Sequence, residues 1–429
     1  MRICTTLALA ATALGLGACS DPRIQPSAPG GELSARADAS DPTPVSLDLV
    51  KIGGFDGGQS LAAEITAYDF VSKRLFVVNG ALGSVDVLDL SNPASPKLIA
   101  TLSGAQFGGP VNSVAADRGV VAIAVEASVK TAPGKVVFVR STTLEIVSQI
   151  TVGSLPDMLT FSPSGKFVVV ANEGEPNASY TVDPEGSVSI IDVSNVNRPT
   201  VRTASFTSYN GQEAALRSSG IRIYGPGASA AQDFEPEYVT IDDAERTAYV
   251  TLQENNAIAI VDLETATVTS VSPLGYKDHR VAGAGLDPSD RDTSNVRIRN
   301  WPVFGMYQPD AIASYTVNGQ TYLITANEGD AREYLGAPGF VEEARVSTLP
   351  LNTSIFTPAA CNGVPCANAG ALGRLTVTNA LGRNPVTGRF DALYVLGGRS
   401  ISIWTAGGAQ MNEVWDSGDQ FERLTQSIP

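Results

Sequence analysis

The stretch PDMLTFSPSGKFVVVANEG, residues 156–174, decides the fold. A β-rich run comes first, a Ser-Pro-Ser-Gly turn follows, and a second run of β-branched residues ends at Asn-Glu-Gly. Turn residues between two such runs are typical of a pair of antiparallel strands. The same unit returns as PEYVTIDDAERTAYVTLQEN, residues 236–255, and as PDAIASYTVNGQTYLITANEG, residues 309–329. A unit that returns in this way indicates a repeat protein.

Two degenerate copies of the unit lie earlier in the chain, and the copies continue into a third β-rich run. The early copies cover residues 64–79 and 112–126. The third runs lie at residues 84–89, 135–139, 187–192 and 257–262. Four-stranded units without a helical period between them predict an all-β fold, a β-propeller of four-stranded blades. A β-sandwich is the alternative, but it does not explain why the same unit returns.

The number of blades follows less directly from the pattern. Five blades are clear, and residues 392–396 and 400–404 suggest a sixth. Residues 420–423 resemble the start of another, and residues 45–53 offer an outer strand to close the ring. We therefore expect seven blades, with the last blade incomplete in this chain.

The N-terminal residues predict export. Residues 1–18 combine one Arg, a short apolar core and small residues at the end, which is typical of a secretory signal peptide. The run Leu16-Gly17-Ala18-Cys19 is similar to the lipobox of bacterial lipoproteins, in which the Cys becomes the lipidated first residue. An ordinary cleavage near Ala18 is the alternative. Ser20, in place of an Asp, favours the outer membrane, with the protein facing the periplasm or the cell surface.

Residues 19–46 are rich in Pro, Ala, Ser and Gly, so they predict a flexible tether. The propeller domain is then expected over residues 47–429. The formal charge of −15 argues against nucleic acid as a partner and is compatible with cations. A single histidine, His279, nearly excludes multi-histidine zinc chemistry. The sequence contains no nucleotide-binding fingerprint, and we expect neither a nucleotide nor a haem. Cys361 and Cys366 predict a local disulfide, because two cysteines alone make a poor metal site.

Acidic residues mark where a site is expected. In a four-stranded blade, the start of the first strand and the end of the second strand lie on the same face. The paired acids occupy these positions, and they are Asp157, Glu173, Glu237, Glu254, Asp310 and Glu328. The long connections 175–186, 207–235, 275–308 and 330–371 are expected on that face too. Oxygen ligands of this kind suit Ca²⁺ or Mg²⁺. The alternative is that Asn-Glu-Gly is only a turn signature.

Arginines of the long connections, Arg299 and Arg332 among them, have two interpretations. They pair with these acids, or they bind an anion such as a phosphate.

Long strings of the chain resemble the choice-of-anchor I family, from about residue 47 to the end. The matching strings lie at residues 74–80, 155–176, 180–192, 305–315, 326–332 and 397–400. The resemblance implies an exported, propeller-like protein with its own anchoring device. Some members are labelled alkaline phosphatase or phytase-like, and the domain also looks like an animal mesenchyme cell-surface glycoprotein. Residues 383–389 lack the Asp-rich turn of the family, which puts a cation site there in doubt, and the family domain continues beyond the equivalent of Phe421.

The function we expect is that of an envelope-anchored lipoprotein whose propeller binds a protein or a phosphorylated small molecule on its loop-rich face, with divalent cations as an option. A Ca²⁺-dependent phosphoesterase is the alternative, and whether the chain is an enzyme stays open. A quinone-dependent dehydrogenase rests on analogy of fold alone.

Overall fold

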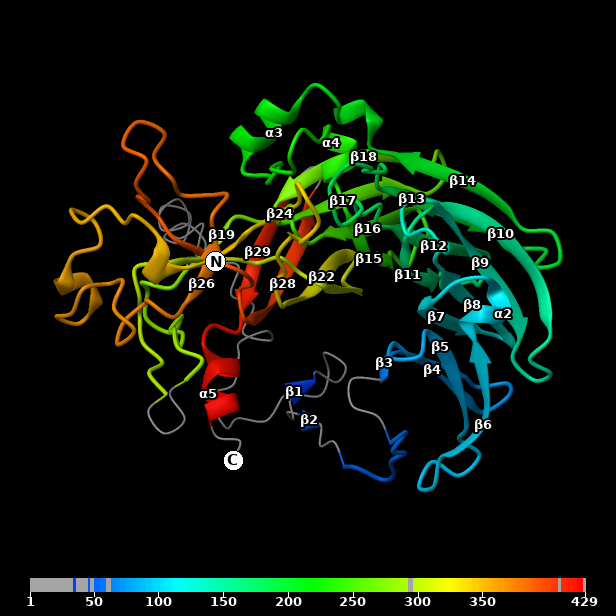
Figure 1. Ribbon diagram of the computed structural model, residues 1–429. Coiled ribbons are helices and arrows are strands. Elements are labelled where there is room, and N and C mark those ends of the chain that lie inside the picture. The colour runs from blue at the N-terminus through cyan, green and yellow to red at the C-terminus, as the bar shows by residue number, and fades with distance from the viewer. Residues whose placement is uncertain are drawn as a thin grey trace, which may run out of the picture.

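The computed structural model describes residues 34–35, 45–46, 50–58, 63–291, 296–407 and 410–426. Its main feature is a set of five four-stranded antiparallel sheets that follow one another around an arc (Figure 1). Their first strands contact their neighbours in chain order. The expected all-β, bladed architecture is confirmed, whereas the number of seven blades stays a prediction.

Four of the sheets consist of consecutive strands. These are β3 (Ala63–Asp69), β4 (Arg74–Asn79), β5 (Ser84–Asp89) and β6 (Lys97–Ser103); β7 (Val111–Asp117), β8 (Val120–Val125), β9 (Pro133–Arg140) and β10 (Ile146–Ser154); β11 (Pro156–Phe161), β12 (Phe167–Asn172), β13 (Ser187–Asp192) and β14 (Thr200–Ser205); and β15 (Pro236–Ile241), β16 (Thr247–Leu252), β17 (Ala257–Asp262) and β18 (Thr267–Pro273).

The apolar runs of the middle strands are explained by burial on both faces. Successive residues of a strand point to opposite faces. Val168 and Val170 of β12 pack with the second sheet, whereas Val169 and Ala171 pack with the fourth. A strand covered on both sides therefore reads as a continuous apolar run rather than as an alternating one. The sheets are thus held together face to face by the cores between them.

The fifth sheet is split in sequence. It contains β21 (Ala311–Val317), β22 (Gln320–Asn327), β28 (Ser400–Gly407) and β29 (Gln410–Asp416). Strand β28 pairs antiparallel with β22, although residues 328–399 separate them. The prediction of a sixth blade at residues 392–396 and 400–404 was therefore wrong, because the second of these runs returns to the sheet that β21 began. The expected blade start at residues 420–423 was also wrong, since these residues begin the helix α5 (Gln420–Gln426).

Two long connections fold together into what we name the insertion body, the described residues of 274–310 and 328–399. One small sheet joins β19 (Tyr276–Asp278), β20 (Phe304–Met306) and β27 (Tyr394–Val395) from both connections. A separate apolar core also mixes the two, with Trp301 and Val303 packed among Leu372, Val377 and Phe390. Its other elements are β23 (Glu333–Tyr334), β24 (Phe340–Val341), β25 (Glu343–Arg345), η2 (Val346–Thr348), η3 (Pro358–Cys361) and β26 (Thr376–Thr378).

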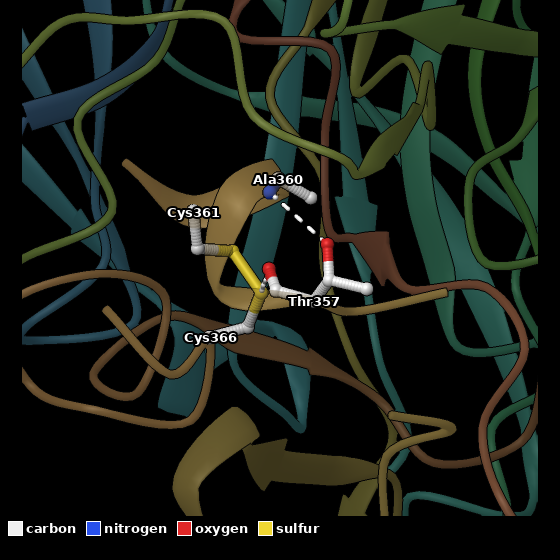
Figure 2. The surroundings of a disulfide bond; sticks show 4 residues. All are labelled: Thr357, Ala360, Cys361 and Cys366. Atoms are coloured by element: carbon white, nitrogen blue, oxygen red, sulfur yellow. Dashed lines mark hydrogen bonds between the residues drawn. A yellow bond between two sulfur atoms is a disulfide. The ribbon is translucent and has the colours of Figure 1, made fainter. Parts of the chain in front are cut away.

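A disulfide joins Cys361 to Cys366 within this core, and both residues are buried (Figure 2). The hydroxyl of Thr357 accepts a hydrogen bond from the backbone N–H of Ala360 at 3.3 Å, and Pro358 follows it, so η3 begins with a cap. The local crosslink fixes a segment that has little regular structure of its own.

Short helices complete the connections between the sheets. They are α2 (Gly104–Phe107), η1 (Thr207–Tyr209), α3 (Glu213–Ser219) and α4 (Ala230–Asp233). None of the helices in the described part of the chain is long and apolar enough to cross a membrane. The expected signal peptide and Cys19 lie outside the described residues, as does most of the expected tether. Within the tether, β1 (Ser34–Ala35) pairs with β2 (Val45–Ser46).

Candidate functional site

The predicted acids lie where the first strand of a blade begins and the second strand ends. Asp157 is the second residue of β11, and Glu173 directly follows β12. Glu237 is the second residue of β15, and Glu254 comes two residues after β16. Asp310 precedes β21, and Glu328 follows β22. Because the two strands of each pair are antiparallel, both acids of a blade come to the same face of the sheets.

The long connections leave from this face as well. They follow β12, β14, β18 and β22, and they cover residues 173–186, 206–235, 274–310 and 328–399. The opposite face carries short turns, such as the one at Asn318 and Gly319, which both have positive φ angles of 51° and 79°. Asn and Gly adopt that conformation at low cost. The long connections and the predicted acids therefore share one face of the scaffold.

Exposure divides the predicted acids into a floor, a middle layer and a rim. Glu237 and Glu254 form the floor and are buried, with exposed fractions of 7% and 4%. Asp157, Glu173 and Asp310 are half-buried, and Glu328 is exposed. We name the acids of the floor and the middle layer, together with the neighbouring Glu235, the carboxylate mouth.

The acids of the carboxylate mouth lie close enough to perturb one another. Burial raises the pKa of Asp157 to about 7, and the charges of Asp310 and Glu254 add to the rise. Burial also raises the pKa of Glu254 to about 7, although the positive charge of Arg332 opposes it. Buried carboxyl groups resist ionisation because a low-dielectric surrounding and like charges both disfavour the charged form.

Glu173 and Glu237 behave in the same way. Burial holds the pKa of each well above its ordinary value, and the charges of Asp157 and Glu254 add to the rise in both cases. Burial raises the pKa of Asp310 too. The Gln253 amide is best oriented with its nitrogen toward Glu237, where it donates to the two carboxyl oxygens at 3.0 and 3.1 Å. Five of the six predicted acids therefore share one face of the sheets and affect one another's ionisation.

Sequence reasoning missed Glu235, the most buried acid of the site. Its exposed fraction is 0%, and burial holds its pKa well above the ordinary value, with Glu254 and Glu173 among the neighbouring charges that add to the rise. Glu235 immediately precedes the first strand of its blade, two residues before Glu237. The run Glu-Pro-Glu at residues 235–237 was the available signal, and only the second acid matched the repeat.

Two carboxyl oxygens at the site accept no hydrogen bond from any described residue. They are Oε1 of Glu235 and Oε2 of Glu254, and both atoms are buried. A buried polar atom without a partner costs about 1–3 kcal/mol. The carboxylate mouth therefore contains two buried carboxyl oxygens that accept no hydrogen bond from the described residues.

Arg332 supplies positive charge to the floor. Its guanidinium forms ion pairs with Asp233 and Glu235, and Nε donates to Oε2 of Glu235 at 3.1 Å. The side chain is only 1% exposed. Of the two interpretations of the arginines, pairing with acids is the one that the structure shows for Arg332, which disfavours the predicted anion site there. Arg299 is exposed, and its backbone pairs with that of Leu286. An anion site at Arg299 stays a prediction.

A second buried arginine continues this network. Arg222 forms an ion pair with Glu342 and donates to the backbone carbonyl of Glu254 at 2.5 Å. Tyr224 lies between the two arginines, with their guanidinium carbons 4.1 and 4.5 Å from the centre of its ring. Its hydroxyl donates to Oε2 of Glu342 at 2.7 Å. Each guanidinium is thus held by a carboxylate and by the face of an aromatic ring.

Aromatic residues join two of the long connections, 173–186 and 328–399. The ring of Tyr180 is 5.2 Å from that of Tyr334 and 6.3 Å from that of Phe340, both in edge-to-face orientation. The backbone N–H of Gly336 donates to the carbonyl of Ala178 at 2.7 Å. The ribbon of β23 and β24 is therefore docked on the connection 173–186. Burial raises the pKa of the Tyr334 hydroxyl, and the charges of Glu235, Glu254 and Glu173 add to the rise.

The fit of a metal ion to these acids can be tested on the geometry. Among the residues that the structure describes, no group of three or more His, Cys, Asp or Glu side chains is arranged to hold a metal ion. Ca²⁺ takes six to eight oxygen ligands at close range. The carboxylate mouth therefore has the right ligand type for Ca²⁺ or Mg²⁺ but lacks a preformed coordination shell.

The sheets and the one-sided site define a β-propeller-like protein. The family model of the choice-of-anchor I domain matches residues 64–428, and the chain belongs to this family. Membership of the family, together with the bladed sheets, supports an exported protein. No curated protein matches the chain.

Several solved structures are similar to the chain at low identity. A nidogen/laminin complex is 14% identical with a TM-score of 0.29, and the match covers 48% of this chain and 61% of that chain. Hydrazine synthase of Kuenenia stuttgartiensis is 12% identical with a TM-score of 0.32, covering 62% and 80%. U3-55K is 9% identical with a TM-score of 0.38, covering 87% and 72%. At TM-scores this low, none of them defines the function.

Proposed function

We propose that this protein is an envelope lipoprotein that binds a positively charged ligand or partner group in the carboxylate mouth. The convergence of six acids, two of them with unused buried oxygens, carries the proposal. A bound cation offsets the mutual repulsion of these groups and fills the unused acceptors. The long connections that surround the mouth supply the variable surface that binding proteins carry on loops.

The anchoring part of the proposal rests on the sequence. Cys19 ends a lipobox-like run, and lipidation there tethers the blades to the outer membrane. Residues 19–46 then provide the reach that lets the loop-rich face meet a ligand in the periplasm or at the cell surface.

No feature of the described site favours the phosphoesterase that we considered from the sequence. A phosphate entering the mouth meets several carboxyl groups, and the buried Arg222 and Arg332 are already paired with acids. Without a cation cluster, the mouth repels an anion. Phosphate ester hydrolysis therefore stays a prediction from the family resemblance.

Calorimetric titration of the detergent-solubilised protein tests the proposal. The probes are Ca²⁺, Mg²⁺ and a short lysine-rich peptide. We expect at least one of them to bind, and we expect Glu173→Gln combined with Glu254→Gln to weaken that binding about tenfold or more. Glu264→Gln, an exposed acid in the turn between β17 and β18 on the opposite face, is the control and leaves binding unchanged. Absence of binding by every probe to a folded protein would overturn the proposal.

A further inference from the structure

Two cavities adjoin at the end of the fifth sheet, and one ion pair separates them. The first has a volume of about 410 Å³ and the second of about 490 Å³. Arg399 and Glu422 line both cavities, and Nη1 of Arg399 donates to Oε1 of Glu422 at 2.6 Å. The rim acid Glu328 lines the first cavity, and Asp330, two residues further on, lines the second. Cavities of this size hold small molecules or the side chains of a partner.

The first cavity lies between the helix α5 and the fifth sheet, and its walls are largely apolar. Ala326 of β22, Ile401 of β28 and Phe421 of α5 line it, and the Phe421 side chain remains 39% exposed. Two of its polar residues are bonded to each other, because Nδ2 of Asn327 donates to Oγ of Ser400 at 3.1 Å. An apolar group that enters the cavity therefore buries apolar surface without depriving these two residues of a partner.

The second cavity is polar and carries an excess of negative charge. Its charged residues are Asp287, Asp290, Asp330, Glu343 and Glu422 on the acidic side and Arg345, Arg374 and Arg399 on the basic side. Asp290 pairs with both Arg345 and Arg374. Asp330 and Glu343 form no ion pair with any residue that the structure describes. A positively charged group is thus the complement of this cavity.

The division into two cavities favours a peptide as the ligand. In an extended peptide, residues i and i+2 point to the same side and lie about 7 Å apart. One peptide can therefore place two different side chains in two adjoining cavities. Its backbone amides then face the charged groups of Arg399 and Glu422, which can hydrogen bond to them. A simple amphiphile has one head and one tail and makes no use of a polar partition between them.

We propose that the two cavities bind an extended segment of a partner protein that carries a large apolar residue and a Lys or Arg two residues apart. The apolar side chain enters the first cavity, against Ile401 and Phe421. The basic side chain enters the second cavity, toward Asp330 and Glu343. None of the acids of the carboxylate mouth lines either cavity, so this site is separate from the proposed function and does not depend on it.

Calorimetric titration of the detergent-solubilised protein tests the proposal, with detergent alone as the blank. The probe is a blocked peptide of Gly and Ser residues that carries Phe and Lys two positions apart. We expect it to bind. Replacing its Phe by Ala weakens binding about tenfold, because burial of the ring is lost. Replacing its Lys by norleucine keeps the length of the side chain and weakens binding about threefold.

Variants of the protein assign each half of the peptide to its cavity. Ala326→Trp fills the first cavity from an exposed position and is expected to remove the preference for Phe over Ala. Asp330→Asn combined with Glu343→Gln is expected to remove the preference for Lys over norleucine. Glu333→Gln changes an exposed acid of the same connection that lines neither cavity, and it leaves binding unchanged. Thermal unfolding shows whether each variant is folded.

The other outcomes overturn the inference in different ways. Peptide binding that is lost in Glu173→Gln with Glu254→Gln, but not in the cavity variants, would place the peptide in the carboxylate mouth and leave the proposed function intact. A preference for Phe without one for Lys would overturn the basic ligand class. Equally tight binding of octylamine would replace the peptide by an amphiphile. No binding of the peptide to the folded protein would overturn the site, whereas the proposed function is decided separately by its own titration.

Discussion

Arg332 holds together acids that come from different parts of the chain. Its guanidinium is buried and paired with Asp233 and Glu235. Arg332→Met keeps most of the side-chain volume but leaves two buried carboxyl groups without their partner. Removing one member of a buried ion pair costs about 3–5 kcal/mol. We expect that loss in the free energy of unfolding, measured by denaturant titration at neutral pH.

An exposed arginine provides the comparison for Arg332→Met. Arg280 pairs with Asp278 at the surface, with the Arg280 side chain 56% exposed. Arg280→Met is therefore expected to change the free energy of unfolding little, because solvent screens an exposed pair. A loss of equal size in the two variants would show that the burial of Arg332 is not what makes it important.

The raised pKa values of the carboxylate mouth make stability depend on pH. Asp157 and Glu254 have pKa values of about 7, above the ordinary values for these groups. Between about pH 4 and pH 7 the folded chain therefore binds more protons than the unfolded chain, and the free energy of unfolding falls as the pH rises. We expect the melting temperature to be several degrees lower at about pH 8 than at about pH 5. Differential scanning calorimetry across that range is the measurement.

Glu254→Gln isolates one of these groups. Glutamine resembles the protonated acid, so the variant is expected to melt higher than the parent at about pH 8 and close to it at about pH 5. A saturating cation at about pH 8 is expected to raise the melting temperature of the parent more than that of the variant. A melting temperature that rises with pH in the parent would contradict this account.

The position of much of the site could be predicted from single residues, whereas its chemistry could be predicted only in part. The repeat placed Asp157, Glu173 and Glu237 on one face because strand direction alone decides that face. Glu235 escaped because it lies outside the repeated unit. The partners of Arg332 were left open because they depend on how two long connections fold against each other, and no pattern in the chain encodes that contact.

At the scale of elements, the insertion body depends on a local crosslink. Cys361 and Cys366 are buried in its core, where regular elements are short. Closing so short a loop contributes about 2 kcal/mol by the chain-entropy estimate. We expect Cys361→Ala with Cys366→Ala to raise the hydrogen-exchange rates of β25, β26 and η3, while the amides of β8 and β12 keep their protection.

Reduction of the unmodified protein is the control for this pair of substitutions. It breaks the same bond without changing the volume of the core, so it is expected to produce the same local increase in exchange. Loss of protection in the blade strands at the same time as in the insertion body would show that the two parts unfold together.

Elements that repeat were predictable, and elements that depart from the repeat were not. Four sheets and the first two strands of the fifth matched the expected units, because buried strands and tight turns follow local rules. Strand β28 was assigned to a new blade because sequence order is the only guide when strands are read one after another. Its pairing with β22 is decided by the fold of everything between them. Helix α5 was missed for a similar reason, since a short terminal segment carries little periodicity.

At the scale of the whole molecule, attachment to the membrane depends on one residue in the proposed arrangement. Cys19→Ser removes the sulfur that would carry lipid. We expect the variant protein to incorporate no labelled fatty acid and to move from the membrane fraction to the soluble fraction on cell fractionation. Cys4→Ser, inside the expected signal peptide, is the control and leaves fractionation unchanged. A Cys19→Ser protein that still sediments with membranes and carries label would contradict lipid anchoring at this residue.

The split of the fifth sheet leads to an expectation about the order in which the chain folds. The cost of closing a loop grows with the logarithm of its length, and contacts between distant residues form slowly. The insertion body lowers that barrier if it collapses first, because its ends meet where the backbones of Gly329 and Gly397 lie too close to admit a Cβ at residue 329. Strands β22 and β28 then nucleate as neighbours. We therefore expect the connection that enlarges the loop-rich face to act also as an internal folding template for the blade that it interrupts.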